Sequence, residues 1–391
     1  MMDSRKIFTA EQSAVRAIAF YLPQFHPIPE NDKWWGNGFT EWRNVVQARP
    51  LIKGHYQPHL PADLGFYDLR SADTRAAQAE LASDYGIHGF CYYHYWFNGK
   101  RLLERPLDDV VKSGKPDFPF CVCWANENWT RRWNGEDQDV LIKQEYSAED
   151  DRLHIRALLR YFEDPRYIKI DGRPLVLIYR ISSLPDPRAT ADIWRQEAVK
   201  AGFPDLYLCT VVSLSSLDFD PTTIGFDAAV DFPPNCNHFT QPIKPLRCRF
   251  KQLDRQARRF LRDPYCENTI LRYSNLAQNI MKRAEPHYKM FPAVTPGWDN
   301  SARRKSGASV YLDSTPEVYR QWLDHSIKQS QQRFENASER LVFINAWNEW
   351  AEGNHLEPDQ KWGHRYLEET RDALDECKDF SATLARSDQA A

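Results

Sequence analysis

Residues 341–353 read LVFINAWNEWAEG, in which a short apolar run turns abruptly into a segment rich in Asn, Trp and Glu. The run combines β-branched and aromatic residues, a composition typical of a buried strand. Comparable runs recur along the chain between stretches that have the character of helices. These runs cover residues 16–22, 89–96, 120–125, 175–179, 206–212, 228–232, 290–295 and 341–347.

Eight strands that alternate with helices predict an α/β fold, the (β/α)₈ TIM barrel. An open doubly wound sheet is disfavoured because the first run continues into PQFHP, which lacks a Gly-rich phosphate loop. Asp171-Gly172 predicts a tight hairpin turn before the fourth strand. We expect a single domain with long βα loops over residues 16–376, an N-terminal extension over 1–15 and a C-terminal tail over 377–391. The expected helices cover residues 76–85, 103–113, 150–162, 193–201, 316–334 and 364–376.

The composition limits the classes of partner. The chain has 391 residues and a formal net charge of -3, so no basic field predicts nucleic-acid binding. Its 13 Trp suit the alternating CH and OH faces of sugars, which favours a carbohydrate partner. Residues 1–14 lack the apolar core of a secretory signal, and no apolar run is long enough to span a bilayer, so we expect a cytoplasmic protein. The cysteines lack metal-ligand spacing, which predicts reduced structural thiols, no metal and no cofactor.

In barrels of this kind, the active site lies at the carboxyl ends of the strands. Polar and aromatic residues are dense at those positions, and we expect them to converge on one face. For single residues a structural alternative stays open: His94 as a core histidine, for example, or Trp96 as a packing residue. The residues expected to bind substrate are Tyr21, His26, Trp35, His94, Tyr95, Trp96, Trp124, Asn126, Glu127, Trp129, Asp231, Trp298, Asp299, Asn348, Trp350 and Glu357.

Glu349 and Glu352 are the candidate catalytic residues. They lie three positions apart directly after the last strand, and Trp347 and Trp350 flank the first of them. Cleavage of a glycosidic bond needs a proton donor for the leaving oxygen and a carboxylate that acts at the anomeric carbon. Two neighbouring carboxyl groups can fill both roles, since each charge affects the pKa of the other group.

Residues 345–353 resemble the motif of family 99 glycoside hydrolases and of the related WbsX-type proteins of bacterial polysaccharide gene clusters. The similarity to the WbsX-type proteins extends over roughly residues 16–367. It is carried by YLPQFHP at 21–27, WWG at 34–36 with FTEW at 39–42, HGFCYYHYW at 88–96, WANENW at 124–129 and TPGWDN at 295–300.

The resemblance to the hydrolases implies a (β/α)₈ barrel and endo-acting cleavage of α-mannosides with retention. By position, Glu349 would deprotonate the sugar 2-OH, which attacks the anomeric carbon to give an epoxide-like intermediate. Glu352 would protonate the leaving group and then activate water. We therefore expect cleavage of an α-linked bacterial polysaccharide or oligosaccharide in O-antigen or surface polysaccharide metabolism, with the sugar and linkage undefined.

Two other functions stay open. The first is a glycosyltransferase or transglycosylase, since WbsX-type proteins are often named transferases. Its metal-dependent form is disfavoured because neither D-x-D triplet, 137–139 or 218–220, directly follows a strand, and we interpret both as solvated loop acids. The second is a non-catalytic glycan-binding barrel, which would not need both Glu349 and Glu352.

Two further acids have open roles. Glu127 follows Asn126 after the third strand, whereas the large clan of glycosidases with an Asn-Glu acid/base places that pair after the fourth. We therefore expect Glu127 either to bind sugar hydroxyls or to hold its loop. Glu41, in the long first loop, is a further candidate for reaching the site.

Residues 244–262 are markedly basic and carry apolar residues at helical spacing. One interpretation is an amphipathic helix packed on the barrel with a solvated basic face. The other is a surface that meets anionic lipid or a lipid-linked glycan, with peripheral contact at the inner membrane. The sequence leaves the oligomeric state undefined.

Overall fold

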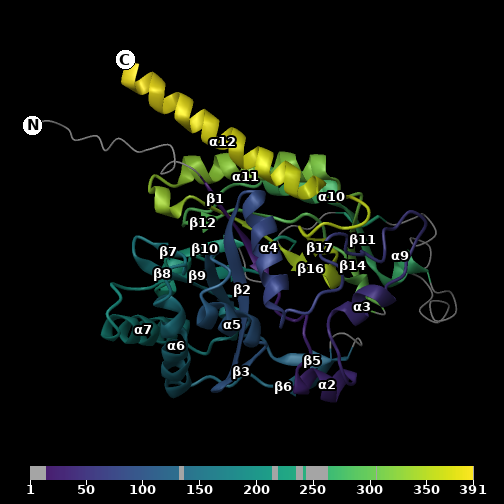
Figure 1. Ribbon diagram of the computed structural model, residues 1–391, viewed down its shortest axis with the longest axis horizontal. Helices are drawn as coiled ribbons and strands as arrows, with labels where there is room; N and C mark the ends of the chain where they lie inside the picture. The colour runs from purple at the N-terminus through teal and green to yellow at the C-terminus, as the bar shows by residue number, and fades with distance from the viewer. Residues whose placement is uncertain are drawn as a thin grey trace, which may run out of the picture.

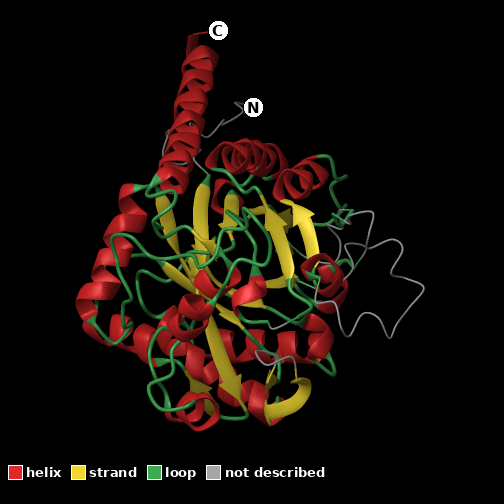
Figure 2. Ribbon diagram, turned by 90° about the vertical axis from the view of Figure 1, so that its right-hand side faces the viewer, coloured by secondary structure: helices red, strands yellow, loops and turns green. Residues whose placement is uncertain are grey.

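A parallel barrel forms the centre of the molecule, with helices packed around it (Figures 1 and 2). The computed structural model describes residues 15–131, 136–213, 219–234, 241–243, 263–304 and 306–390. The order of the barrel strands is β12-β10-β9-β8-β4-β2-β1-β15-β13, and each neighbouring pair is parallel. Their bounds are β1 Arg16–Tyr21, β2 Ile87–Phe97, β4 Phe120–Trp124, β8 Arg173–Ile178, β9 Tyr207–Val212, β10 Ala228–Asp231, β12 Met290–Phe291, β13 Ala293–Val294 and β15 Leu341–Ile344. The (β/α)₈ prediction is confirmed.

One short segment closes the barrel. β12 pairs with β10, whereas β13 pairs with β15, and only Pro292 separates the two. Proline has no backbone N–H, so the ladder is interrupted there. The carbonyl of Pro292 still accepts a hydrogen bond from the backbone N–H of Phe343, at 3.0 Å. The nine strands are therefore eight chain segments, as the sequence predicts.

The helices around the barrel begin at polar caps. The side chains of Ser71, Ser147, Asp186 and Thr315 each accept a hydrogen bond from a backbone N–H in the first turn of their helix. The longer helices are α4 Ala72–Asp84, α5 Arg105–Ser113, α6 Ala148–Phe162, α7 Pro187–Lys200, α10 Tyr273–Met281, α11 Pro316–Arg333 and α12 Arg365–Ala390. The last was expected to end at residue 376, but it continues to Ala390 and projects from the body (Figure 2). Among the described residues, none of the helices has the length and apolar character required to cross a membrane.

Aromatic rings and thiols fill the barrel. The ring of Phe20 packs on Tyr93, Phe232 and Phe343, with centroids 5.1 to 5.7 Å apart. Cys91, Cys121, Cys123 and Cys209 are fully buried and form no disulfide. Burial raises the pKa of the Cys91 thiol well above its usual value, which keeps it protonated. The described barrel cysteines are thus reduced packing residues, as predicted.

The loops carry most of the remaining elements. The Asp171-Gly172 turn joins β7 to β8 as predicted, with both residues at positive φ. The triplet 137–139 lies inside strand β6 rather than in a loop, and Asp220 caps the short helix η3. The basic segment 244–262 lies outside the described residues. The other elements are α2 Pro29–Trp35, α3 Trp42–Gln47, α9 Pro264–Glu267, β3 Lys100–Leu102, β5 Trp129–Arg131, β6 Glu136–Ile142, β7 Lys169–Ile170, β11 Thr269–Arg272, β14 Ser309–Leu312, β16 Asn348–Glu349, β17 Asn354–His355, η2 Ile181–Ser183, η3 Pro221–Ile224, η7 Asn300–Ala302, η8 Ala337–Glu339 and η9 Trp350–Glu352.

Candidate active site

The eighth strand leads into a tight hairpin that carries the two candidate carboxylates. β16 ends at Glu349, η9 ends at Glu352, and β17 returns antiparallel to β16. Gly353 makes the turn at φ +55°, where a Cβ would lie 3.0 Å from that of Asp299. The seventh loop packs directly on this hairpin, since the N–H of Asp299 donates to the carbonyl of Glu352 at 2.6 Å. Glycine at 297 permits this contact, because a Cβ there would lie 2.8 Å from the carbonyl oxygen of Gly353.

Arg303 joins three acidic side chains that come from distant parts of the chain. Its Nη2 lies 2.9 Å from Glu349 Oε2 and its Nη1 lies 2.6 Å from Glu352 Oε1. Its Nε contacts Oε1 of Glu41, at the N-cap of α3, at 2.7 Å. The first, seventh and eighth loops therefore meet at one guanidinium group. Glu41, whose place was open from the sequence, belongs to this cluster.

The cluster carries more negative than positive charge when it is fully ionised. Burial raises the pKa of Glu349 to about 8, although the charge on Arg303 opposes the rise. Burial also raises the pKa of Glu352, and the charge on Glu41 adds to that rise. Three largely buried carboxylates share the contacts of one guanidinium group, and the pKa of about 8 for Glu349 indicates that this carboxyl group holds a proton at neutral pH. The two candidate residues can therefore provide one acid and one base together.

Tyrosines from the second strand stand beside the carboxylates. The charge on Glu349, after burial, helps to raise the pKa of both Tyr93 and Tyr95, which places these phenols near that carboxyl group. The Tyr95 hydroxyl also accepts a hydrogen bond from Gln24 Nε2 at 3.0 Å. The Tyr95 ring packs edge-on against Trp129, with centroids 5.3 Å apart. Trp129 is thus held to the cluster through Tyr95, and a role of either residue in substrate binding stays a prediction.

Glu357 is the centre of a separate hydrogen-bond network within the same loop. Its carboxylate accepts hydrogen bonds from Tyr67 Oη at 2.7 Å, Gln78 Nε2 at 2.6 Å and Trp350 Nε1 at 2.6 Å. Burial raises the pKa of Glu357 to about 7. Asn348 is tied to both backbone groups of Leu22. Asn348, Trp350 and Glu357, all expected to bind substrate, thus support the hairpin instead of facing Arg303.

Four residues at strand ends point outward. Alternation along β2 turns Tyr93 and Tyr95 toward the carboxylates, so His94 and Trp96 face the helices. His94 Nε2 lies 3.0 Å from His154 on α6, and Trp96 Nε1 donates to Asp150 on the same helix. Trp124 also faces outward and packs on His154 and on Trp194 of α7. Tyr21 donates a hydrogen bond to Gln78 of α4. The alternative of a core histidine and a packing tryptophan describes His94 and Trp96 here.

The other predicted residues are spread around the rim. Asn126 holds both backbone groups of Arg180, whose Nε contacts Glu127 at 2.8 Å. Asp231, at the end of β10, pairs with Arg283 at 2.8 Å. His26 is buried, and desolvation lowers its pKa to about 4, so the ring is neutral. Trp35 ends α2 and packs loosely on Phe39, with centroids 6.0 Å apart.

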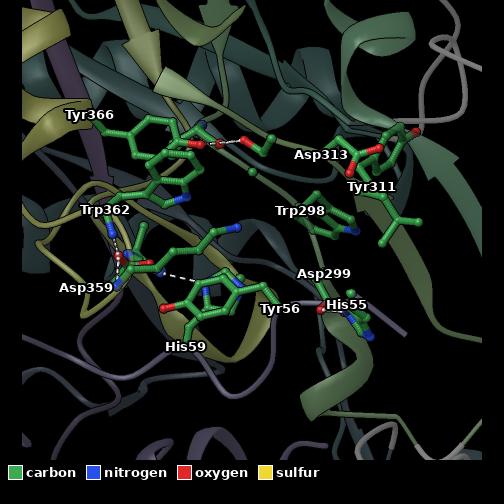
Figure 3. A pocket seen from close by; sticks show the side chains of 18 residues that line it. His55, Tyr56, His59, Trp298, Asp299, Tyr311, Asp313, Asp359, Trp362 and Tyr366 are labelled. Carbon is green, nitrogen blue, oxygen red and sulfur yellow. Dashed lines mark hydrogen bonds and ion pairs between the residues drawn. The ribbon is translucent and has the colours of Figure 1, made fainter. Parts of the chain in front are cut away.

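Trp298 and Asp299 lie on a cavity beside the carboxylate hairpin (Figure 3). The cavity has a volume of about 90 Å³, and Gly353 contributes to its wall. Its aromatic lining includes Tyr56, Trp298, Tyr311, Trp362 and Tyr366. Asp299 Oδ2 contacts His55 Nε2 and Gln57 Nε2, each at 2.6 Å, so it fixes the first loop against the seventh. Among the described residues, the only group with metal-ligand geometry is His59, His355 and Asp359, on the same wall.

Sequence reasoning missed Arg303 and most of the cavity. Arg303 begins the basic run RRK in the loop after the seventh strand. Paired buried carboxylates require a nearby cation, and this run is the signal that would have suggested one. The cavity residues Tyr56 and Trp362 come from loops with no apolar periodicity, so the sequence offers no comparable signal for them.

The amino-acid sequence matches one protein family and two similar proteins from Xanthomonas. Residues 17–370 match the protein family described as Glycosyltransferase WbsX. The chain is 46% identical over 382 residues to a protein named Uncharacterized protein WxcX from Xanthomonas campestris pv. campestris strain ATCC 33913, covering 97% of this chain and 52% of that protein. A protein of the same name from strain B100 is 46% identical over 369 residues, covering 94% and 50%. The chain thus spans about half the length of these relatives.

Solved structures share the fold at low sequence identity. One is the GH99 endo-alpha-mannosidase from Bacteroides thetaiotaomicron in complex with BIS-TRIS-Propane, with a TM-score of 0.57 and 15% identity over 94% of this chain and 98% of that chain. A second structure of this mannosidase has a TM-score of 0.55, 16% identity and coverages of 95% and 98%. A glycoside hydrolase-like protein has a TM-score of 0.56, 12% identity and coverages of 96% and 97%. At these identities the comparison supports the barrel fold.

Proposed function

The chain belongs to the family described as Glycosyltransferase WbsX, and we propose that it cleaves an α-linked bacterial polysaccharide or oligosaccharide by means of Glu349 and Glu352. The observation that carries this proposal is the contact of Arg303 with both carboxylates at the end of the eighth strand. A binding module has no need for two buried acids held at one cation. The proposed setting is the metabolism of O-antigen or another surface polysaccharide.

The proposed reaction uses one proton held between the two carboxyl groups. Glu352 has a side chain that is 20% exposed, against 8% for Glu349, so it is the group more open to a leaving oxygen and to water. In the retaining scheme that the resemblance implies, Glu349 takes the proton of the sugar 2-OH while that oxygen attacks the anomeric carbon. Glu352 gives its proton to the departing glycosidic oxygen. It then takes a proton from the water that opens the epoxide-like intermediate, as the proton on Glu349 returns to the 2-oxygen.

The scheme requires the proton on Glu352, whereas the pKa of Glu349, raised to about 8 by burial, places a proton on Glu349 in the protein without substrate. The two states differ in the position of one proton within a coupled pair. A sugar 2-OH that donates a hydrogen bond to Glu349 favours its ionised form, because a hydrogen bond to the charged form lowers a pKa. Substrate binding therefore moves the pair toward the reactive state.

Transfer to an acceptor other than water is the second candidate, and the family's description favours it. The same two carboxylates would serve, since a sugar hydroxyl can replace water in the second step. The aromatic cavity beside Gly353 offers apolar faces on which an acceptor sugar can stack. The two candidates differ in the fate of the intermediate and not in the residues that form it.

The experiment is a screen of the purified protein against α-linked bacterial polysaccharides, including mannans and rhamnans, with products read by mass spectrometry in ¹⁸O-labelled water. We expect wild type to release oligosaccharides that carry the label. Glu349→Gln and Glu352→Gln should each lower turnover by about 10²–10⁴-fold, the usual contribution of a positioned acid or base. Glu163→Gln, a change of an exposed glutamate after α6, is the matched control and should leave turnover unchanged.

The outcomes separate the candidates. Unlabelled products that grow when an acceptor oligosaccharide is added indicate transglycosylation. Glycan binding without any product, equal in wild type and in both Gln variants, contradicts an enzymatic role. Full activity in Glu352→Gln contradicts the assigned acid/base residue even if a glycan is cleaved.

A further inference from the structure

Three metal-ligating side chains come together on the wall of the aromatic cavity, outside the carboxylate cluster (Figure 3). They are His59 from the first loop and His355 and Asp359 from the eighth loop. One ligand atom from each lies within 4.8 Å of the other two. His59 Nδ1 is 2.9 Å from His355 Nε2, which in turn is 4.0 Å from Asp359 Oδ2. Ligand atoms bound to one tetrahedral zinc, with bonds of about 2.0–2.2 Å, lie about 3.3–3.6 Å apart. The observed separations of 2.9 and 4.0 Å bracket this value, so shifts of about half an ångström would bring the three atoms to one cation.

Outer contacts hold each ligand atom toward the same point. His355 Nδ1 lies 2.9 Å from the carbonyl oxygen of Glu357, so Nδ1 carries the proton and Nε2 keeps its lone pair. Asp359 Oδ1 accepts the backbone N–H groups of Lys361 and Trp362 at 3.0 and 2.6 Å, which leaves Oδ2 directed at the histidines. The His59 ring packs on Tyr56 with centroids 4.2 Å apart. A histidine that donates its second ring N–H to a carbonyl is the usual support of a metal ligand.

We propose that His59, His355 and Asp359 form a binding site for Zn²⁺, with a fourth coordination position open to the cavity. Two imidazoles and one carboxylate suit zinc, whereas calcium and magnesium prefer oxygen ligands. All three residues line the cavity, so water or a sugar hydroxyl can reach the fourth position. The zinc site takes no part in the proposed cleavage, which uses Glu349 and Glu352. Zinc binding can therefore be tested independently of that activity.

The charges around the group are compatible with a divalent cation. Without a cation, His59 Nδ1 donates a hydrogen bond to His355 Nε2 at 2.9 Å, because the His355 proton lies on Nδ1. A bound cation would take the place of this shared proton, which can move to the second ring nitrogen of His59. Asp299 adds negative charge nearby, and Lys361 opposes it with its ammonium group beside the rings of Tyr56 and Trp362.

A cation at this place would link two loops that shape the carboxylate hairpin. The first loop already contacts the eighth loop where the N–H of Ala62 donates to the carbonyl of Pro358. The His355 ring stacks on Trp350 at 3.7 Å between centroids, and Trp350 is the residue between Glu349 and Ala351. Zinc at His355 would thus stabilise the position of this hairpin. We expect a gain in thermal stability, since a ligand that binds only the folded state raises the midpoint of unfolding.

The test is titration of the chelator-treated full-length chain with ZnSO₄, followed by calorimetry and by elemental analysis after gel filtration. We expect about one equivalent of zinc per chain and a rise in the melting temperature. Asp359→Asn keeps the acceptor for the two backbone N–H groups but replaces Oδ2 by an amide nitrogen, so affinity should fall at least tenfold, on the scale of about 10–100-fold known for weaker, outer-contact changes. His59→Gln should give the same loss.

His364→Gln is the matched control, because His364 is also a histidine between an aromatic hydroxyl and a carboxylate, Tyr85 and Asp63. It should bind zinc as wild type does. Cys266→Ser, which removes an exposed thiol, should also leave the stoichiometry unchanged. Circular dichroism confirms that each variant is folded. Absence of zinc uptake by wild type overturns the proposal, and so does equal uptake by wild type, Asp359→Asn and His59→Gln.

Discussion

Two buried carboxylate centres within one loop show how differently the same chemical group can be held. Glu349 and Glu352 lie against Arg303, together with Glu41. Glu357, a few residues later, is surrounded by neutral donors from Tyr67, Gln78 and Trp350. Burial raises the pKa of a member of each centre, Glu349 to about 8 and Glu357 to about 7.

The two centres differ in the kind of group that contacts the buried carboxylates. At Glu357 every observed contact is a hydrogen bond to a neutral group, so the carboxylate serves as an acceptor that joins three parts of the structure. At Arg303 the acids outnumber the cation, and no arrangement of protons satisfies all of them equally. A surplus of charge in a dry site leaves a proton free to move, which is what general acid–base catalysis requires. The Glu357 centre therefore supports the structure, whereas the Arg303 centre is suited to acid–base chemistry.

The largest effect is expected at Arg303, the cation of the proposed catalytic centre. Arg303→Met keeps much of the side-chain length but leaves Glu41, Glu349 and Glu352 without the group that contacts all three. Removing one partner of a buried ion pair costs about 3–5 kcal/mol of unfolding free energy. Turnover should also be lost, because the carboxyl groups become protonated when the positive charge is gone. Guanidinium unfolding and the glycan assay measure the two effects.

A surface ion pair supplies the control for this change. Arg70 pairs with Asp68, and the two side chains are 43% and 39% exposed. Arg70→Met should therefore cost only about 0–1 kcal/mol. Adding Glu41→Gln to Arg303→Met should restore part of the stability, since it removes one of the three buried carboxyl groups that have lost their counter-ion. Equal, small losses for Arg303→Met and Arg70→Met would show that Arg303 is not a buried counter-ion.

A smaller difference in unfolding free energy is expected between glutamine substitutions at the two centres. In Glu357→Gln the new amide N–H₂ group faces donors, so at least one buried hydrogen bond is lost, at about 1–3 kcal/mol of unfolding free energy. In Glu349→Gln a carboxyl group that already holds a proton at neutral pH is replaced by a neutral amide, so the unfolding free energy should stay nearly unchanged while turnover falls. Denaturant unfolding of both variants and of wild type measures the comparison. A loss of stability in Glu349→Gln as large as in Glu357→Gln would contradict it.

Much of the fold follows from the sequence because each strand is a buried run with its own turn signals. Even the closing segment was predicted as one strand, although Pro292 divides it into β12 and β13. The tail was harder to predict, since α12 continues to Ala390 beyond the apolar pattern that suggested an end at residue 376. A helix end that is not marked by proline or glycine has no strong local signal.

The site was predicted in part, and the physical reason is the phase of the strands. Glu349 and Glu352 follow directly from a polar segment after an apolar strand. In β2, however, both faces are buried, so the sequence shows no alternation that tells whether Tyr93 or His94 faces the interior. His94 and Trp96 were therefore chosen along with Tyr95. Arg303 contributes through a contact between separate loops, which sequence periodicity does not encode.

The smallest expected effect is a dependence of stability on pH that both centres share. For Glu349 and Glu357 the folded pKa, about 8 and about 7, lies above the ordinary value of 4.5 for a glutamate. The folded state therefore binds more protons than the unfolded state, and stability falls as pH rises through the folded pKa values. Buried histidines act in the opposite direction, since burial lowers the pKa of His94 to about 3, and their contribution is complete only about one pH unit above their ordinary value of 6.5.

Between about pH 7.5 and pH 8.5 the carboxyl contribution therefore dominates among these groups, and the unfolding free energy should fall by about 0.5–1 kcal/mol. Denaturant unfolding at a series of pH values and constant ionic strength measures this slope. Glu349→Gln should remove most of this fall, and Glu357→Gln only a small part of it, at the lower end of the range. A stability that rises across this range in wild type would contradict raised pKa values at both centres. An identical slope in the two variants would instead place the titrating group elsewhere in the chain.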